Sequence, residues 1–355
     1  MSKKTVIVGM SGGVDSSVSA LLLKMEGYEV IGLYMKNWED EHEDIGCSST
    51  RDFEDVANVC NQIGIPFYPV NFTKEYKEFV FAHFLTELHA GNTPNPDILC
   101  NREIKFNILL NKAKELGGDY LATGHYACID SSYNLLKGKD ETKDQSYFLY
   151  PLKKHILKNV LFPVGELPKT TVRTLARDHR LATANKKDST GICFIGKREF
   201  REFLSHYIPY RKGIFETLEG KALGEHVGAA FYTIGQRKGL GIGGPGDAWF
   251  VVGKDMKRNV VFVAQGENHP ALYSTSLLAK EATWIQESPP RFPLRASAKI
   301  RYRQKEEPCT VSYDHHSTLL TVHFDRAQRA VTPSQSIVFY QGDICLGGAI
   351  ITAIK

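Results

Sequence analysis

The pattern of apolar and polar positions changes along the chain near residue 205. Before this point, short apolar runs typical of buried strands alternate with segments whose apolar positions recur about every 3.6 residues, as in helices. The expected strands are residues 5–10, 29–35, 67–70 and 120–123, and the expected helices are residues 51–63, 73–90 and 101–116. In the second of these helices, Phe79, His83 and Leu88 are among the positions expected to face inward. The alternation predicts a parallel sheet covered by helices, with ligands at the carboxyl ends of the strands.

Beyond residue 210 the expected elements are short, β-rich and separated by glycines. Strand candidates are residues 224–234, 249–253, 259–264, 296–303, 310–313, 319–324, 336–340 and 344–351. Strands at such short spacing are typical of a small barrel or sandwich. We therefore predict an α/β domain with a parallel sheet over residues 1–208, a small β-rich middle domain over residues 209–275 and a C-terminal β-barrel over residues 276–355.

The composition is that of an ordinary globular protein, with 42% hydrophobic and 24% charged residues in a chain of 355. No stretch approaches the roughly 20 apolar residues of a membrane span, and too few apolar residues follow the N-terminal Met-Ser-Lys-Lys for a signal peptide. We therefore expect a cytoplasmic protein with no membrane partner. The net charge of +4 permits an anionic partner without requiring one. Several basic pairs lie after residue 180, where they indicate either a solvated surface or a polyanion-binding one.

The seven cysteines lie at positions 47, 60, 100, 128, 193, 309 and 345. Their number is odd and none forms a Cys-x-x-Cys pair, which argues against a disulfide scaffold, a zinc ribbon and a CxxC-held iron–sulfur cluster. In a reducing compartment we expect thiols, most of them small buried hydrophobes.

Residues 9–16, Gly-Met-Ser-Gly-Gly-Val-Asp-Ser, join the first strand to an amphipathic segment. Gly12 and Gly13 would let backbone amides approach a ligand closely, Ser16 and Ser17 are expected to cap the helix, and the positive end of the helix favours a phosphate. No Lys follows the second glycine, so this is not the P-loop GxxxxGK[ST]. A glycine-rich turn before a capped helix is the alternative. Ser-Gly-Gly-Xaa-Asp-Ser is, however, similar to the signature of PP-loop ATP pyrophosphatases, which implies cleavage of ATP between its α and β phosphates and adenylation of a carbonyl oxygen.

Two further segments each contain a cysteine. Residues 95–102 read Asn-Pro-Asp-Ile-Leu-Cys-Asn-Arg, and a helix start with Arg102 and Lys105 nearby would lower the pKa of the Cys100 thiol. The alternative is a buried cysteine at a helix start, with Asp97 serving only as a cap. Residues 187–195 read Lys-Asp-Ser-Thr-Gly-Ile-Cys-Phe-Ile, and periodicity alone would make Cys193 a core strand thiol.

Taken in this order, the three segments resemble those of the tRNA-specific 2-thiouridylases. The resemblance extends over essentially the whole chain and includes Gly-Gln-Arg-Lys-Gly-Leu-Gly (235–241) and Leu-Gly-Gly (346–348). It implies a PP-loop, adenine nucleotide α-hydrolase-like first domain and a tRNA-binding C-terminal barrel. The implied activity is ATP-dependent 2-thiolation of the wobble uridine in the anticodon loop of tRNA, with release of AMP and pyrophosphate.

The chemistry of that reaction explains the implied catalytic residues. The uridine C2 carbonyl is a poor electrophile until AMP is transferred to its oxygen, after which a sulfur nucleophile can attack C2. The resemblance implies that Cys193 carries a persulfide received from a donor such as a cysteine desulfurase or a sulfur-relay protein. Cys100 then either attacks that persulfide to liberate sulfide or closes a disulfide with Cys193 as sulfur leaves, and Asp97 acts as general acid/base.

The resemblance also implies the binding residues. ATP contacts carry over to Gly9, Met10, Ser11, Gly12, Gly13, Val14, Asp15, Ser16, Met35 and Gly124, with Asp15 a candidate to help hold Mg²⁺. By pattern alone, Met35 fits the core equally well. Contacts with tRNA carry over to Asn95, Pro96 and Asp97 around the target base, and to His125, Lys143, Asp144, Gln145, Arg301, Tyr302 and Gln335.

Two of these tRNA positions have a further interpretation. Without the resemblance, Tyr302 is equally an aromatic on the charged face of an edge strand. The family usually has Gly where this chain has Ser334, just before Gln335, and Ser would be strained there if the loop needs a positive φ.

Three other functions are weighed against this one. An amidating or lysidine-forming PP-loop ligase would have no use for two mobile cysteines. A CxxC-dependent thiolase lacks its CxxC here, and an RNA-binding protein with a structural ATP would not need the intact loop together with both thiols.

Overall fold

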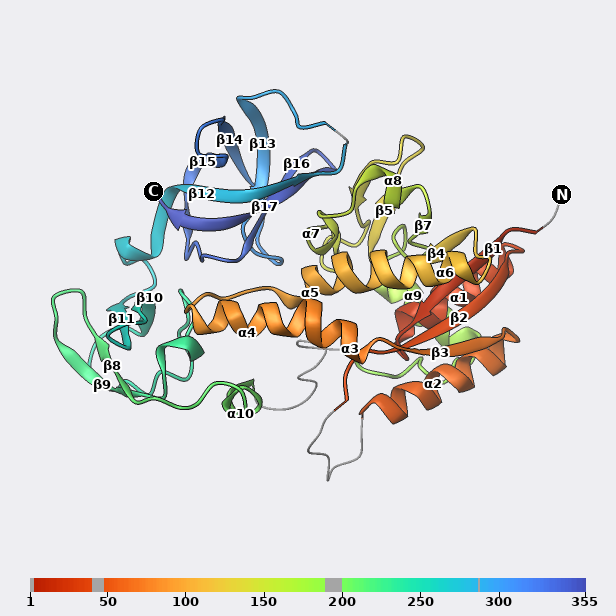
Figure 1. Cartoon of the computed structure of the whole chain (residues 1–355), viewed down its shortest axis with the longest axis horizontal. Coiled ribbons are helices and arrows are strands. Elements are labelled where there is room, and N and C mark those ends of the chain that lie inside the picture. Colours follow the sequence, from red (N-terminus) through yellow and green to blue (C-terminus); the bar gives the residue numbers. More distant parts are fainter. Residues whose placement is uncertain (1–2, 40–47, 189–199, 287) are drawn as a thin grey trace.

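The computed structural model describes residues 3–39, 48–188, 200–286 and 288–355. The first part of the chain forms a parallel sheet in the order β3-β2-β1-β4-β7 (Figure 1). These strands are β1 (Thr5–Met10), β2 (Glu29–Lys36), β3 (Phe67–Asn71), β4 (Tyr120–Ala122) and β7 (Val160–Leu161). The predicted parallel sheet is confirmed, and β7 is an additional strand that the apolar pattern did not reveal.

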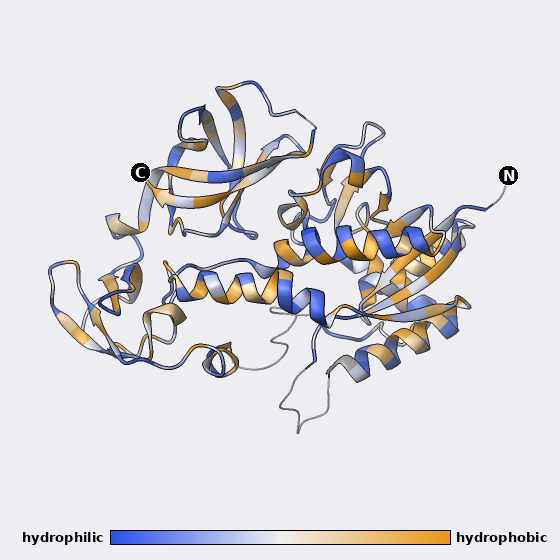
Figure 2. Ribbon diagram, viewed as in Figure 1, coloured by the Kyte–Doolittle hydropathy of each residue, from blue (hydrophilic) through white to orange (hydrophobic). Residues whose placement is uncertain are grey.

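Helices cover both faces of this sheet, because alternate side chains of each strand point to opposite sides. On one face, Val6 and Val8 of β1 pack in a buried cluster with Ala20 of α1 (Val14–Met25) and Val59 of α2 (Ser48–Ile63). On the other face, Ile7 belongs to the cluster that contains residues of η2 (Cys100–Leu109) and α6 (Leu110–Glu115). Figure 2 shows the mainly hydrophobic strands between helices that carry hydrophilic residues on their outer sides.

The segment expected as one helix over residues 73–90 is α3 (Thr73–Tyr76), the π-helix η1 (Lys77–Phe81) and α4 (Ala82–His89). The wider π turn changes the phase of the buried face. The prediction that Phe79 and His83 face inward is therefore wrong, since Phe79 is 44% exposed and His83 is exposed, whereas Leu88 is buried as expected. Val80 and Phe84 occupy the inner positions instead.

The next helix begins earlier than expected. Its first turn is α5 (Pro96–Leu99), and it continues through η2 and α6. Cys100 consequently lies one turn inside the helix. The sequence-based expectation that it lies at the helix start is wrong.

The middle part of the chain forms a sheet in the order β10-β11-β8-β9. Its strands are β8 (Gly213–Glu216), β9 (Ala222–His226), β10 (Trp249–Asp255) and β11 (Val260–Gln265). The strand expected over residues 224–234 ends at His226. Gly228, with φ +142°, turns the chain into a short 3₁₀ helix, η3 (Ala229–Phe231).

The C-terminal part is the predicted barrel. Its strands are β12 (Tyr273–Trp284), β13 (Leu294–Lys299), β14 (Glu307–Asp314), β15 (Leu319–Arg329), β16 (Ser336–Gln341) and β17 (Ile344–Ile354). The barrel closes because β12 pairs with both β15 and β17. The apolar pattern had not indicated β12.

The barrel and the first domain share a continuous sheet. The hairpin β5 (Ala127–Ile129) and β6 (Leu135–Lys137) belongs to the first domain in sequence, yet β6 pairs with β17. The buried Tyr147 hydroxyl donates to Ser336 O at 2.8 Å, and Lys299 pairs with the buried Asp144 at 3.1 Å. These contacts attach the barrel firmly to the first domain.

The remaining helical segments are α7 (Ser146–Leu149), α8 (Lys154–Leu157), α9 (Lys169–Asp178), α10 (Phe200–Ser205) and η4 (Pro270–Leu272). Among the residues that the structure describes, no helix combines the length and the apolar character needed to cross a membrane.

We expect Gly165→Ala to destabilise the first domain by about 3 kcal/mol or more, because a Cβ at this position would lie 1.8 Å from Ala127 O. A fall in Tm of about 6 °C or more in differential scanning fluorimetry would confirm the overlap. Gly224→Ala is the matched control, since nothing lies within 4 Å of its Cβ position. Equal Tm values for the two variants would contradict the prediction.

Candidate functional site

β1 is the central strand of the parallel sheet and pairs with β4. The strand order reverses between these two strands. Open α/β sheets bind ligands at such a point, outside the carboxyl ends of the strands. The two segments that leave these ends are residues 9–16 after β1 and residues 123–125 after β4. They form the centre of the candidate site.

The helix α1 begins at Val14 with Gly13 as its N-cap, so the expected capping by Ser16 and Ser17 is wrong. Both serines lie inside the first turn, where their hydroxyls donate back to Gly13 O at 3.1 and 2.8 Å. Since Gly13 has no side chain, no side-chain oxygen caps the first amides of α1 at this position. Such a helix start is suited to an anion.

Two glycines allow this turn to pack closely. Gly12 has φ +73°, and a Cβ there would lie 2.7 Å from Asp52 O. A Cβ on Gly124 would lie 2.7 Å from Ser16 N. The segment after β4 therefore contacts the start of α1 directly, which only a residue without a side chain permits.

Asp15, in the first turn of α1, is held by two groups that the sequence analysis did not single out. Lys169, the first residue of α9, binds both carboxylate oxygens at 2.7 and 2.8 Å, and the Tyr126 hydroxyl donates to one of them at 2.7 Å. Lys169 also pairs with Asp188 at 2.9 Å. Lys169 and Tyr126 lie more than 100 residues from Asp15 in sequence, so no local sequence pattern indicated these contacts.

Asp188 connects this cluster to further cations. It pairs with Lys143 at 2.7 Å and with Arg173 at 2.6 Å. Burial opposes ionisation, but hydrogen bonds from Lys143 and Lys169 hold the pKa of Asp188 well below its ordinary value. Burial and the nearby Asp15 raise the pKa of Tyr126, so that it remains a protonated donor.

The other predicted ATP contacts lie at the same end of the sheet. Met10 and Val14 are buried in the core, and Ser11 contacts the Ser16 hydroxyl at 3.2 Å. Met35, near the end of β2, is half-buried and packs against the core, as its apolar pattern allowed. Contact of these residues with ATP stays a prediction.

Asn95 is the N-cap of α5 and accepts a hydrogen bond from Asp97 N at 3.1 Å. The alternative in which Asp97 serves only as the cap is therefore wrong. Asp97 and Cys100 are three residues apart on one helix and so share a face. Burial raises the pKa of the Asp97 carboxyl, with the positive charge of Lys105 opposing the shift. Cys100 is buried, with 5% of its surface exposed.

His125 joins this helix to the end of the sheet where β1 and β4 end. Its Nε2 lies 3.4 Å from Lys105 Nζ, and its Nδ1 lies 2.7 Å from Thr123 Oγ1. Burial lowers the pKa of His125 well below its ordinary value, and Lys105 adds to the shift. A neutral imidazole is therefore expected at this position.

The other predicted tRNA contacts already bind groups of the protein. Asp144 is buried and accepts from the amides of Gly138 and Ser146, and Gln145 accepts from Tyr126 N at 3.0 Å. Asp144 also pairs with Lys299 of the barrel at 3.1 Å, which makes it a structural residue of the joint between the two domains. Contact of Lys143, Asp144 and Gln145 with RNA stays a prediction.

Arg301 and Tyr302 follow the end of β13. Tyr302 packs against Phe148 with a ring separation of 4.4 Å, and its hydroxyl donates to Lys143 O at 3.3 Å. It lies in the turn that joins β13 to β14 of the barrel, which excludes the alternative of an aromatic on an edge strand. The Arg301 guanidinium donates to Ile234 O of the middle domain and to Ala330 O of the barrel. Their contact with RNA also remains a prediction.

Ser334 has φ +64°, so the loop does adopt the left-handed conformation that glycine would tolerate better. Its hydroxyl contacts Glu87, and the Gln335 side chain donates to Thr93 O. Both residues therefore bind the segment that precedes Asn95.

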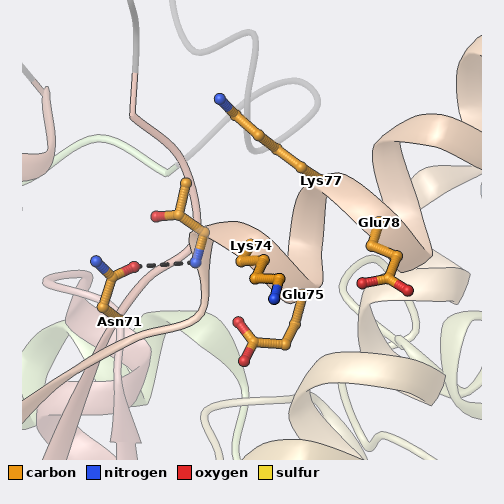
Figure 3. Close-up of a pocket in the computed structure, with 6 residues that line it drawn as sticks. Asn71, Lys74, Glu75, Lys77 and Glu78 are labelled. Atoms are coloured by element: carbon orange, nitrogen blue, oxygen red, sulfur yellow. Dashed lines mark hydrogen bonds between the residues drawn. The ribbon is translucent and has the colours of Figure 1, made fainter.

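The predicted pairing of Cys100 with Cys193 involves residue 193, which lies outside the described residues, as does Cys47. Across the described ranges, no group of three or more His, Cys, Asp or Glu side chains is arranged to hold a metal ion. A cavity of about 790 Å³ lies where β3 leads into α3 and η1 (Figure 3), and none of the predicted site residues lines it. It is lined by Asn71, Thr73, Lys74, Glu75, Lys77 and Glu78.

Three family models match successive parts of the chain. They are the tRNA methyl transferase HUP domain over residues 4–197, the tRNA methyl transferase PRC-barrel domain over 201–265 and the aminomethyltransferase beta-barrel domain over 274–351.

Curated relatives match over nearly the full length. The tRNA-specific 2-thiouridylase MnmA of Protochlamydia amoebophila is 59% identical over 98% of this chain and 93% of its own length. MnmA 2 of Geobacillus kaustophilus is 55% identical over 98% and 95%, and MnmA of Alkaliphilus oremlandii is 54% identical over 98% and 97%.

We expect Lys105→Met to raise the pKa values of both Asp97 and His125. The ammonium lowers the pKa of each of these groups, so its removal should shift both upward. NMR titration of the His125 imidazole and the Asp97 carboxyl would measure the shifts. Lys112→Met, which removes an exposed partner of Glu115 on the same continuous helix, should leave both values unchanged. An unchanged or lower pKa for His125 in the Lys105 variant would contradict the assignment.

Proposed function

Because this chain belongs to the family of tRNA-specific 2-thiouridylases, which are sulfurtransferases, we propose that it thiolates the wobble uridine of tRNA at C2 in an ATP-dependent reaction. The substrate is the anticodon loop of tRNA, and the sulfur comes from a persulfide donor such as a cysteine desulfurase or a sulfur-relay protein. The products other than the thiolated tRNA are AMP and pyrophosphate.

One observation supports this function more than any other. Residues 123–125 touch both halves of the required site, since Gly124 packs on the first turn of α1 and His125 lies 3.4 Å from Lys105 on the helix of Asp97 and Cys100. A nucleotide at the start of α1 and a base near Asp97 would thus be held by one short segment. Transfer of AMP to the base requires such proximity.

The residues present fit ATP with Mg²⁺. The start of α1 is suited to phosphate oxygens, and the Asp15 carboxylate would be a ligand for Mg²⁺ bound with the nucleotide. The bound Mg²⁺ would neutralise charge on the pyrophosphate as it leaves. Lys169 lies within 2.8 Å of both Asp15 carboxylate oxygens and supplies a second cation at the same place.

The proposed chemistry at the base begins with Asp97. Its raised pKa suits a general acid/base that exchanges a proton with the uracil ring while the C2 oxygen attacks the α phosphorus of ATP. Pyrophosphate leaves from the α phosphorus. The C2 oxygen, now bonded to AMP, becomes a good leaving group.

Sulfur then replaces that oxygen by one of two balanced routes. In the first, the Cys100 thiolate attacks the Cys193 persulfide at the sulfur bonded to its Cβ, so that sulfide is released and adds to C2. In the second, the persulfide adds to C2 directly, and Cys100 then attacks Cys193 to release the sulfur. Both routes expel AMP and leave a Cys100–Cys193 disulfide, which a thiol reductant must reduce before the next turnover.

The alternatives fit less well. An amidating or lysidine-forming ligase would need Asp15 and its surroundings but neither cysteine. A protein that merely binds RNA would have no use for a buried acid of raised pKa beside Cys100. The mass of tRNA before and after incubation with ATP and a persulfide source tests the proposal, since thiolation replaces one oxygen by sulfur. An unchanged mass with active donor present would refute it.

We expect Asp15→Ala to reduce pyrophosphate release in the presence of tRNA by about a hundredfold or more, because the variant loses a ligand for the cation at the departing phosphates. A coupled pyrophosphate assay would measure the rate. Asp178→Ala, which removes an exposed carboxylate at the end of α9, is the control and should release pyrophosphate normally. Normal release from the Asp15 variant would refute the ATP assignment.

We expect Cys193→Ala to abolish thiolation while its affinity for tRNA stays nearly unchanged, since the thiol carries sulfur and does not bind the backbone. Nucleoside mass spectrometry and filter binding would measure the two quantities. Cys309→Ala is the control, because burial in the barrel raises the pKa of that thiol to about 12 and leaves it unreactive. Equal loss of binding and thiolation in the Cys193 variant would indicate a structural role.

A further inference from the structure

Residues 90–95 form the segment between α4 and α5, which ends at Asn95 and leads directly to Asp97. Both other domains contact this segment. On the side of the middle domain, Thr93 Oγ1 lies 3.4 Å from Thr233 Oγ1. A Cβ at Gly91, where φ is +83°, would lie 2.4 Å from the Met256 side chain. The segment thus packs tightly against the middle domain.

The barrel contacts the same segment through two consecutive residues. The Gln335 side-chain amide donates to Thr93 O, and the Ser334 hydroxyl donates to the Glu87 carboxylate at the end of α4. That same Glu87 oxygen accepts from Asn92 Nδ2 at 2.9 Å. One loop of the barrel is therefore bonded both to Thr93 of the segment and to the end of α4, where the bonded Glu87 carboxylate also holds Asn92.

This barrel loop is itself held in place. Ser334 N donates to Ile351 O at 2.8 Å, and Ile351 N donates to Gln335 O at 2.9 Å. Ser334 keeps φ +64°, although a side chain is disfavoured there. A hydroxyl at this position can reach Glu87, which a glycine could not do.

We propose that Ser334 and Gln335 are positioning residues for the thiolation reaction: they fix residues 92–95, and through them the start of α5, so that Asp97 meets the target base in a reactive geometry. Only Pro94 lies between Thr93 and Asn95, whose side chain caps the helix at Asp97 N. A shift of Thr93 would therefore pass directly to the proposed acid/base, and small displacements of a catalytic group have large effects on rate. On this view Gln335 acts through the protein and not through a direct contact with RNA. The inference rests on the proposed function.

Gln335→Met tests this role, because methionine is close to glutamine in shape but donates no hydrogen bond. We expect the single-turnover thiolation rate to fall about tenfold while the Kd for tRNA changes less than about twofold. Amides of residues 91–97 should exchange hydrogen for deuterium faster in the free variant, since the segment has lost a tether. Gln341→Met is the matched control: its side chain also donates to a backbone carbonyl, Arg295 O at 3.2 Å, but at the other end of β16.

Ser334→Ala provides a second test if the Gln335 variant folds poorly. It keeps a Cβ at the same backbone position and removes only the hydroxyl that reaches Glu87, so we expect the same changes with smaller amplitude. A rise in the Kd for tRNA of about tenfold in Gln335→Met, with unchanged exchange at residues 91–97, would overturn the proposal in favour of direct RNA contact. Unchanged rate and exchange in both variants would overturn it as well. Because exchange is measured without tRNA or ATP, it tests the tether even if the wild-type chain fails to thiolate tRNA.

Discussion

The parallel pairing of β1 with β4 is the constraint on which the candidate site depends. Val6 is in register with Tyr120, and Val8 with Ala122, so the two strands end side by side. The turn of residues 9–16 and the segment of residues 123–125 must then leave the sheet at the same place. Gly124 permits the resulting contact with the start of α1, where a side chain would overlap Ser16 N. Strand pairing thus brings together groups more than 100 residues apart.

Two lysines of the site each interact with groups from more than one element. Lys169 lies between Asp15 and Asp188, so the carboxylate proposed to meet the cation of the nucleotide is already paired in the free protein. Lys105 lies beside His125 and lowers the pKa values of both His125 and Asp97. Burial still raises the pKa of Asp97, because the loss of hydration outweighs the attraction of this one ammonium group. The site therefore combines lysine ammonium groups, which suit an anionic ligand, with a carboxyl group of raised pKa.

The barrel is attached to the first domain at two different places. The pairing of β6 with β17 and the buried contacts of Tyr147 and Asp144 form the larger joint. Ser334 and Gln335 contact the segment before Asp97 at the second joint. The two joints fix the barrel with respect to the ends of β1 and β4, which a flexible tether between separate domains could not do.

Local patterns in the chain determined the parallel sheet, the glycine turn of residues 9–16 and the existence of a C-terminal barrel, because period and turn chemistry depend on neighbours in sequence. They did not place Asp97 and Cys100 on one helix, because the expected helix began only at residue 101, whereas α5 begins at Pro96. The family resemblance, and not a local pattern, marked Ser334 as a position where a positive φ would matter. The same local patterns misplaced Phe79 and His83, because a regular period of 3.6 residues does not allow for the wider π turn of η1, which changes the phase of the buried face. They gave no sign of Lys169 or Tyr126 beside Asp15, or of Gln335 beside Thr93. Those contacts join residues 111 or more positions apart, and only the tertiary structure could decide them, because nothing in the local sequence specifies which distant side chain fills a given space.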